Sequence, residues 1–224
     1  MRNEVMRYAK KFSVISVLLA LSLSCAGCAD ASSAEQVVTP EVTAEVTAAA
    51  QLANQAAAAT SAPNWNIQAE GSHIHFSAEQ EGETFTGSFG EFSGRILFDP
   101  ETPESSAVDI TIPLTSVDAG SRDRNSTLPG KVWFSVKKFP DARFTSSSIS
   151  KQDEGYLAKG ELTLKGKSLP LDLPFDLQIS GERAVMTGQV ILDRTLWNVG
   201  AAPWDTDEWV SRQVKLDIQV TADR

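Results

Sequence analysis

The chain has 224 residues and a formal net charge of −9 at pH 7. This acidic balance argues against a nucleic-acid partner, which requires a basic face. The length fits one or two domains, and the composition changes sharply along the chain.

Residues 1–28 have the pattern of an export signal. A basic start precedes the apolar run 12–23, about a dozen residues long and too short for a confident membrane span. Both cysteines of the chain follow directly. Ala26-Gly27-Cys28 resembles the end of a bacterial lipoprotein signal, so we expect Cys28 to carry lipid and to anchor an exported, periplasmic protein to the membrane. Lipidation at Cys25 and simple signal cleavage remain the alternatives.

Residues 29–63 are a low-complexity mixture of Ala, Thr, Val, Gln, Ser and Pro without an aromatic residue. The alanine-rich part, 44–59, has good helix propensity. It has almost no large apolar side chain with which to dock, so we expect a tether between the membrane and a folded domain.

We expect the folded domain over residues 64–224, where aromatic residues and glycines appear. These are about 160 residues, enough for one good core. Apolar and polar residues alternate in most of this region, which is the period of a strand with one buried face. The expected inward positions of its first half are Ile74, Phe76 and Ala78, then Phe85, Gly87 and Phe89, then Phe92, Gly94, Ile96 and Phe98, and then Val108, Ile110, Ile112 and Leu114.

The segment from Ser121 to Phe139 breaks the alternation. It predicts one or two short helices, interrupted at Pro129-Gly130. Because it interrupts the strands and carries Trp133 and Phe134, we expect it to gate the mouth of the domain.

The strictest alternation lies between Gly155 and Asp193. It predicts three consecutive antiparallel strands joined by short turns at 165–167 and 181–183. In the middle strand Pro170 and Pro174 fall on the outward face, which indicates an edge, a bulge or a strong bend. The inward positions of that strand are Leu169, Leu171, Leu173, Phe175, Leu177 and Ile179.

A loop over 197–211 and a last strand with Val214, Leu216, Ile218 and Val220 complete the chain. The count is eight to ten antiparallel strands with nearly no helix, an all-β fold that fits a sandwich or a barrel. Glycines on the apolar faces favour an antiparallel up-and-down, lipocalin-like barrel of about eight strands. Such a barrel has an interior just wide enough for one small ligand.

The domain resembles the YceI-like polyisoprenoid-binding family of periplasmic lipocalin-like barrels over about residues 65–222. The order and spacing of several short motifs carry the resemblance: Trp65-Asn66-Ile67, Ser72 to Phe76, Gly87 to Gly94, Ser121-Arg122-Asp123, Phe139 to Ser146 and Gly160 to Gly166. The chain departs from the family after Asp123, where Asn125 to Gly130 replaces a His-Leu pair. Residues 199–210 are similar to a subgroup found beside cytochrome b-type membrane proteins, which implies such a partner.

The resemblance implies a non-catalytic carrier that holds an isoprenoid lipid such as a quinone and requires no other cofactor. Each buried CH₂ contributes about 0.8 kcal/mol, against an immobilisation cost of about 4–15 kcal/mol, so a few isoprene units suffice for useful affinity. A homodimer is left open. The expected ligand-binding residues are Phe76, Phe89, Phe92, Phe98, Ile110, Ile112, Arg122, Trp133, Phe134, Phe144, Leu162, Leu164, Leu173, Phe175 and Trp197.

Two groups of residues raise the alternative of a metal site. His73 and His75 are the only histidines and share one strand face, so they need a further ligand such as Glu79. The acidic run 205–208 lacks the spacing of a calcium loop. We expect solvated or strand-pairing roles for both groups.

Two arginine positions also have alternative interpretations. Arg122 with Asp123 either orients a ligand headgroup or forms a local ion pair or helix cap. Arg194 ends a strand and faces the same way as Leu192, so it is a candidate for a buried arginine.

Two other classes of function remain as alternatives. An isomerase or cyclase acting on an apolar substrate needs an inward acid or base, whereas strand parity places Asp109, Asp172 and Asp176 outward. A packed barrel without a ligand would act through protein contacts.

Overall fold

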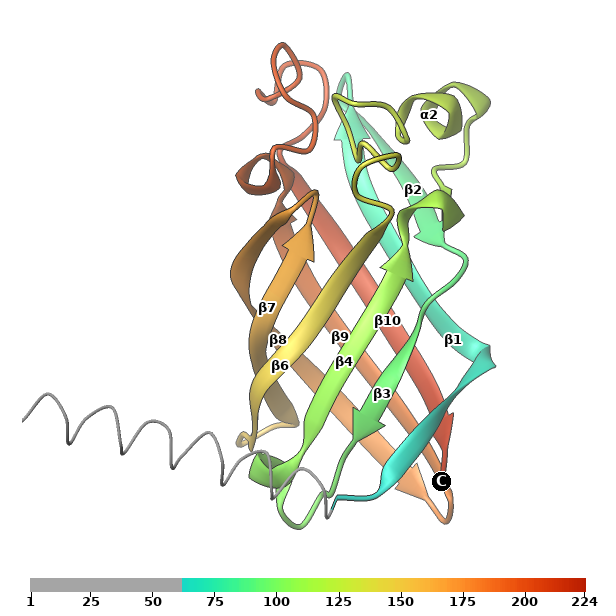
Figure 1. The fold of residues 1–224 in the computed structure, drawn as a ribbon, viewed down its shortest axis with the longest axis vertical. Coiled ribbons are helices and arrows are strands. Elements are labelled where there is room, and N and C mark those ends of the chain that lie inside the picture. The colour runs from blue at the N-terminus through green and yellow to red at the C-terminus, as the bar shows by residue number, and fades with distance from the viewer. Residues whose placement is uncertain (1–61) are drawn as a thin grey trace, which may run out of the picture. The chain divides into compact units, whose positions relative to one another are not determined.

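The structure, a computed structural model, describes residues 62–224 (Figure 1). The predicted export signal, Cys25, Cys28 and residues 29–61 of the predicted tether lie outside the described residues. The last two residues of that tether, Ala62 and Pro63, belong to the folded domain, because Ala62 is buried and the Pro63 carbonyl accepts a hydrogen bond from Phe98 N at 3.0 Å. No helix within residues 62–224 is long and apolar enough to cross a membrane. The strands are β1 (Asn64–Gln80), β2 (Glu83–Phe89), β3 (Ser93–Leu97), β4 (Ala107–Pro113), β5 (Val117–Asp118), β6 (Asp141–Lys151), β7 (Tyr156–Leu164), β8 (Lys167–Ser180), β9 (Arg183–Asp193) and β10 (Gln213–Asp223). The helical segments are η1 (Pro103–Ser105), η2 (Leu114–Ser116), α2 (Arg122–Thr127) and η3 (Arg194–Trp197).

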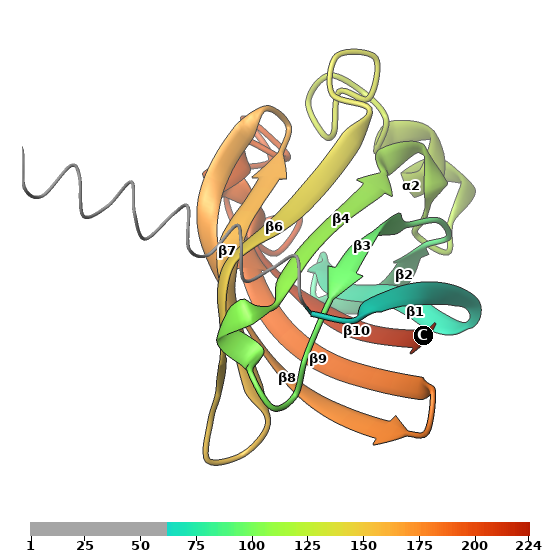
Figure 2. The ribbon, with the colours of Figure 1, turned by 60° about the horizontal axis from the view of Figure 1, so that its bottom comes forward.

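The strands form one antiparallel sheet that closes on itself. Its order is β10-β9-β8-β7-β6-β4-β3-β1-β2-β5, and a further pairing joins β10 to β1. Figure 2 shows β1 lying beside β10 where the ring closes. Eight strands make the closed ring, while β2 and β5 extend the sheet beyond β1. The predicted barrel is therefore confirmed and the sandwich alternative is wrong.

Strand β1 closes the barrel because it bends sharply near its middle. Its register with β10 shifts between Gln68 and His73. Gly71 lies in that interval with φ of +81°, a conformation that favours glycine. A Cβ at this position would also stand 2.9 Å from Thr221 Oγ1, which donates a hydrogen bond to the Gly71 carbonyl. The bend thus depends on a residue without a side chain.

The predicted three-stranded meander is β7, β8 and β9. Lys165 and Gly166 join the first two strands with positive φ at both residues, as a two-residue hairpin requires. β8 pairs with β7 over Lys167–Phe175 but with β9 only over Phe175–Ser180. Pro170 and Pro174 fall in the half of β8 that pairs with β7 alone. A residue without a backbone N–H group is tolerated there, because the other edge of the strand has no ladder partner.

The predicted strand parity holds through the core. Leu173 is 7% exposed, whereas its neighbours Asp172 and Pro174 are exposed. One cluster of buried side chains fills the barrel, and its members include Trp65 on β1 and Phe134 between α2 and β6. Ile179, near the end of β8, is 37% exposed, because β8 continues beyond the part that pairs with β7.

Two irregular segments lie over the same end of the barrel, opposite the C-terminus (Figure 1). They are residues 119–140, which include α2, and residues 194–212; we call them the roof segments. The Val132 carbonyl accepts hydrogen bonds from Gly200 N at 3.0 Å and Ala201 N at 3.3 Å, which joins the two segments. The predicted break at 121–139 is confirmed as one short helix followed by turns.

Candidate functional site

The barrel interior contains two adjoining chambers. The lower chamber has a volume of about 150 Å³, and the upper chamber, next to the roof segments, has a volume of about 340 Å³. Together they reach the range of roughly 300–1,000 Å³ that is typical of small-molecule sites. Four side chains line both chambers and form a waist between them: Ile74, Ile112, Leu162 and Leu216.

The lower chamber is lined by apolar side chains alone. Its lining residue Phe175 stacks on Tyr156, which lies outside the lining, at a centroid distance of 5.3 Å, and Phe98 packs edge-on against both. The Trp65 indole donates to the Phe98 carbonyl at 2.9 Å, so its one polar atom is satisfied by the backbone. The chamber therefore suits a hydrocarbon chain. The predicted residues that line it are Phe92, Phe98, Ile110, Ile112, Phe144, Leu162, Leu173 and Phe175.

The upper chamber has an aromatic wall. Phe76 packs against Phe89 at 5.7 Å, and Phe89 packs against Phe134 of the roof at 6.1 Å. Gly87 leaves the space that the Phe76 ring occupies, because a Cβ there would stand 2.3 Å from Phe76 Cζ. The predicted residues that line this chamber are Phe76, Phe89, Ile112, Trp133, Phe134, Leu162, Leu164 and Trp197.

Five polar residues also line the upper chamber: Gln80, Asp123, Arg124, Thr127 and Arg194. The predicted Arg122 is absent from both linings and is exposed on α2. Its expected place in the cavity is therefore corrected to Arg124. Residues two apart on a helix do not share a face, so the position of the arginine depends on a helix phase that the sequence does not specify. For the fourteen predicted residues that do line the cavity, ligand contact stays a prediction.

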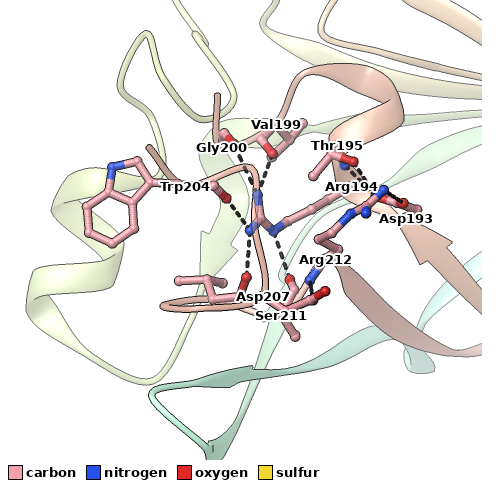
Figure 3. Close-up of polar contacts among 10 residues, drawn as sticks. Asp193, Arg194, Thr195, Val199, Gly200, Trp204, Asp207, Ser211 and Arg212 are labelled. Carbon is pink, nitrogen blue, oxygen red and sulfur yellow. Dashed lines mark hydrogen bonds and ion pairs between the residues drawn. The ribbon is translucent and has the colours of Figure 1, made fainter. Parts of the chain in front are cut away.

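Arg194 is a buried arginine, 5% exposed, at the start of η3. It donates hydrogen bonds to five backbone carbonyls at 2.5–3.3 Å (Figure 3). The acceptors all belong to the second roof segment: Ser211, Val199, Gly200, Trp204 and Val210. Burial lowers the pKa of the guanidinium, and nearby carboxylates, Asp193 foremost, oppose that shift. The sequence identified Arg194 as a candidate buried residue but gave no sign that it organises a loop.

Side chains also connect the two roof segments to each other and to the barrel. Lys165 Nζ, in the β7–β8 turn, donates to the Val132 carbonyl at 2.8 Å and to the Asn198 carbonyl at 2.6 Å. Burial lowers the pKa of Lys165. Trp133 and Trp204 pack at 6.1 Å across the junction. The roof is thus a connected structure over the upper chamber.

The candidate metal ligands lie outside the cavity. The His73 and His75 rings stack at 4.3 Å on the outer face of β1, and burial, followed by His75, lowers the pKa of His73. Asp207 accepts a hydrogen bond from the Arg212 backbone at 2.6 Å. Within residues 62–224 no three His, Cys, Asp or Glu side chains are grouped so as to hold a metal ion.

The sequence has recognisable relatives. The YceI-like domain family matches residues 65–222. A UPF0312 protein of Photorhabdus laumondii is 34% identical over 140 residues, 61% of this chain and 72% of the relative. A UPF0312 protein of Yersinia enterocolitica is 37% identical over 123 residues, 54% of this chain and 64% of the relative. The match to the Yersinia protein thus covers less than two thirds of that protein.

Solved structures share the fold. Burkholderia cenocepacia BcnA superposes with a TM-score of 0.67 at 28% identity, covering 70% of this chain and 99% of BcnA. The Campylobacter jejuni YceI protein gives a TM-score of 0.57 at 25% identity, covering 62% and 84% of the two chains. A polyisoprenoid-binding domain of Saccharophagus degradans gives 0.54 at 17% identity, covering 71% and 97%. The last likeness concerns the fold alone.

Proposed function

The chain belongs to the YceI-like family, and from that premise we propose that it is a non-catalytic carrier for one long apolar isoprenoid lipid. The observation that carries the proposal is the two-chamber cavity, whose lower chamber has only apolar side chains in its wall. Isoprenoid chains gain roughly 25 cal/mol for each Å² of apolar surface that they bury.

The distribution of polar residues favours one orientation of the lipid. Its chain lies in the lower chamber and passes the waist, because that wall offers no partner for a polar atom. Its polar end lies in the upper chamber, where the five polar lining residues are found. A quinone or a polyprenyl derivative has this shape, with a polar group at one end only.

The same distribution favours a carrier over an isomerase or cyclase. Such an enzyme needs an acid or base beside the reacting part of the chain. Among residues 62–224, none that lines the lower chamber or the waist is ionisable. An isoprenoid chain in the lower chamber and the waist would therefore contact no group that could protonate it.

We further propose that the protein is exported, lipidated at Cys28 and tethered through residues 29–61. An anchor would keep the barrel close to the membrane in which isoprenoid lipids reside. A cytochrome b-type membrane partner and a homodimer stay predictions from the sequence.

Extraction of the purified protein tests the proposal. Protein from export-competent cells is extracted with organic solvent and the extract is examined by mass spectrometry; we expect an isoprenoid lipid. Phe175→Trp partly fills the lower chamber and lowers the yield with the fold intact, whereas Asp176→Trp, on the exposed face of β8, leaves the yield unchanged. A wild-type protein that yields no apolar molecule and takes up no isoprenoid quinone leaves only the packed-barrel alternative.

A further inference from the structure

Three segments meet at one corner of the roof end of the barrel, and we call them the basic corner: residues 131–139, 165–167 and 196–200. Lys165 Nζ donates a hydrogen bond to the Val132 carbonyl at 2.8 Å, which joins the second segment to the first. Lys167 Nζ donates to the Leu196 carbonyl, which joins the second segment to the third. The corner is therefore one surface, although its parts lie far apart in the sequence.

The basic corner concentrates positive charge on an acidic protein. Eight lysines lie within residues 62–224, and five of them belong to this corner: Lys131, Lys137, Lys138, Lys165 and Lys167. All but Lys165 are exposed. None of the three segments contains an acidic residue, whereas the whole chain has 29 Asp and Glu against 20 Lys and Arg. The corner therefore complements an anionic surface.

Apolar side chains lie among these lysines. Leu196 is 52% exposed and Val132 is 39% exposed. Phe139 packs on the β7–β8 turn, since a Cβ at Gly166 would stand 2.5 Å from Phe139 Cε1, and the Lys138 ammonium lies 4.9 Å from the centroid of that ring. Segments that bind the interface of an anionic membrane have this composition, in which apolar groups enter the headgroup boundary while lysines contact the lipid phosphates.

The opposite side of the roof is acidic, which gives the surface a direction. Asp205, Asp207 and Glu208 lie close together in the second roof segment. The adjoining Trp209 carbonyl accepts a hydrogen bond at 2.9 Å from Glu81 N, in the turn between β1 and β2. In the ring of eight strands β1 and β7 are four places apart in either direction, so the acidic side and the basic corner lie across the barrel from each other.

We propose that the basic corner docks the barrel on the surface of an anionic lipid bilayer, with Leu196 and Val132 entering the interface. Lysine is depleted from protein–protein interfaces, and Leu and Val are seldom their hot spots, so the composition favours a lipid surface over an acidic protein. Attraction to such a surface falls off within about a Debye length, so the acidic side, across the barrel, opposes docking weakly. Docking in this way brings the roof segments and the upper chamber beneath them to the membrane.

Binding to vesicles tests the proposal on the full-length chain without any isoprenoid. Every protein carries Cys28→Ser, so that no anchor at this residue contributes. Partition to phosphatidylcholine vesicles, which are neutral, is compared with partition to vesicles that also contain anionic phosphatidylglycerol. The neutral vesicles measure every contribution that does not depend on charge, including that of a retained signal segment. We expect about tenfold tighter binding to the anionic vesicles, and a smaller difference as salt is added.

Two double variants remove the same charge from different places. Lys131→Gln with Lys137→Gln changes the basic corner and should weaken binding to the anionic vesicles by about tenfold. Lys151→Gln with Lys159→Gln removes two exposed charges from β6 and β7. We expect this control to bind the anionic vesicles nearly as tightly as the protein with all four lysines.

A pair of single variants tests the apolar contact. Leu196→Gln should weaken binding to the anionic vesicles several-fold, because the amide enters the interface less readily than the aliphatic group. Ile179→Gln is the control, since Ile179 is also exposed but lies near the end of β8 that is away from the roof. We expect it to leave binding unchanged. Circular dichroism confirms that each variant is folded.

Three results would overturn the proposal. Equal binding to neutral and anionic vesicles would leave an acidic protein as the partner that the corner fits. Equal losses for the two lysine pairs would mean that the net charge, and not the corner, draws the protein to the vesicles. An unchanged affinity for Leu196→Gln would show that no apolar group enters the interface. Since no isoprenoid is present in these measurements, none of the three results bears on the carrier function.

Discussion

Arg194 is a buried cation whose hydrogen bonds all go to backbone carbonyls rather than to a carboxylate. Burying a charge is costly unless its hydrogen bonds are complete, and here they are. In return, one side chain satisfies five carbonyl groups of a loop that has little secondary structure to satisfy them. Arg194 therefore acts as the internal support of the second roof segment.

Removing that support should loosen the roof. Arg194→Met leaves the five carbonyls without their donor, and we expect a loss of about 3 kcal/mol or more in the free energy of unfolding, because each buried acceptor without a partner costs about 1–3 kcal/mol. The rate of backbone amide hydrogen exchange should rise first in residues 198–212. Arg212→Met is the matched control, because its ion pair with Asp193 is open to solvent, with side chains 45% and 27% exposed, and such a pair is worth less than about 1 kcal/mol. Equal losses for the two variants in denaturant titrations would contradict this role for Arg194.

The parity of β8 gives a second prediction at single positions. Leu173→Asp places an unpaired carboxylate in the lower chamber wall and should cost about 4 kcal/mol or more. Gln178→Asp lies on the exposed face and should change stability by less than about 0.5 kcal/mol. Thermal melts followed by circular dichroism measure both. The reverse order of stabilities would mean that the strand register is wrong by one residue.

At the scale of elements, the strands and the break at 121–139 could be predicted, but the orientation of the side chains on α2 could not. Alternation indicates which face of a strand is buried, so the inward positions of β4, β8 and β10 follow from the sequence alone. α2 has only six residues, and its phase depends on contacts such as the Asn125 side chain with the Ala119 N–H at 2.7 Å. No periodicity encodes such contacts. The prediction therefore chose Arg122, although the lining residue is Arg124.

The connection between the roof segments suggests how the ligand leaves. Lys165→Met removes the bonds to the Val132 and Asn198 carbonyls while keeping the side-chain length. We expect several-fold faster release of a bound isoprenoid, with little change in melting temperature because most of the barrel is untouched. Lys159→Met, on the exposed face of β7, is the control. Release is measured as the transfer of a fluorescent isoprenoid from the protein to vesicles. An unchanged release rate would show that these two bonds do not restrain the roof.

At the scale of the whole molecule, the proposed anchor would decide where the barrel meets the proposed lipid. If Cys28 carries lipid, a labelled fatty acid fed to cells marks the wild type but not Cys28→Ser, and the variant stays unprocessed or is freely soluble. This prediction rests on the run of small residues before Cys28 and on the absence of cysteine after it in the sequence. Cys25→Ser is the matched control and keeps the label. Equal labelling of wild type and Cys28→Ser would refute the anchor at this position.

The closed barrel also gives the cavity one continuous wall, with a purely apolar part at one end and a polar part under the roof. The alternation within each strand and the glycines on the apolar faces predicted this fold. The separation into two chambers with a waist at Ile74, Ile112, Leu162 and Leu216 could not be predicted, since it depends on how side chains from four different strands meet. That separation is what favours an elongated ligand over a compact one.

Native mass spectrometry of the wild-type protein, purified from export-competent cells, tests the carrier function most directly. The reference mass is that of the polypeptide after processing and lipidation. We predict a folded species whose mass exceeds this reference by the mass of one isoprenoid lipid. On denaturation that mass is lost and is recovered in the organic extract. A folded species without added mass, which also takes up no isoprenoid offered to it, would contradict the carrier function.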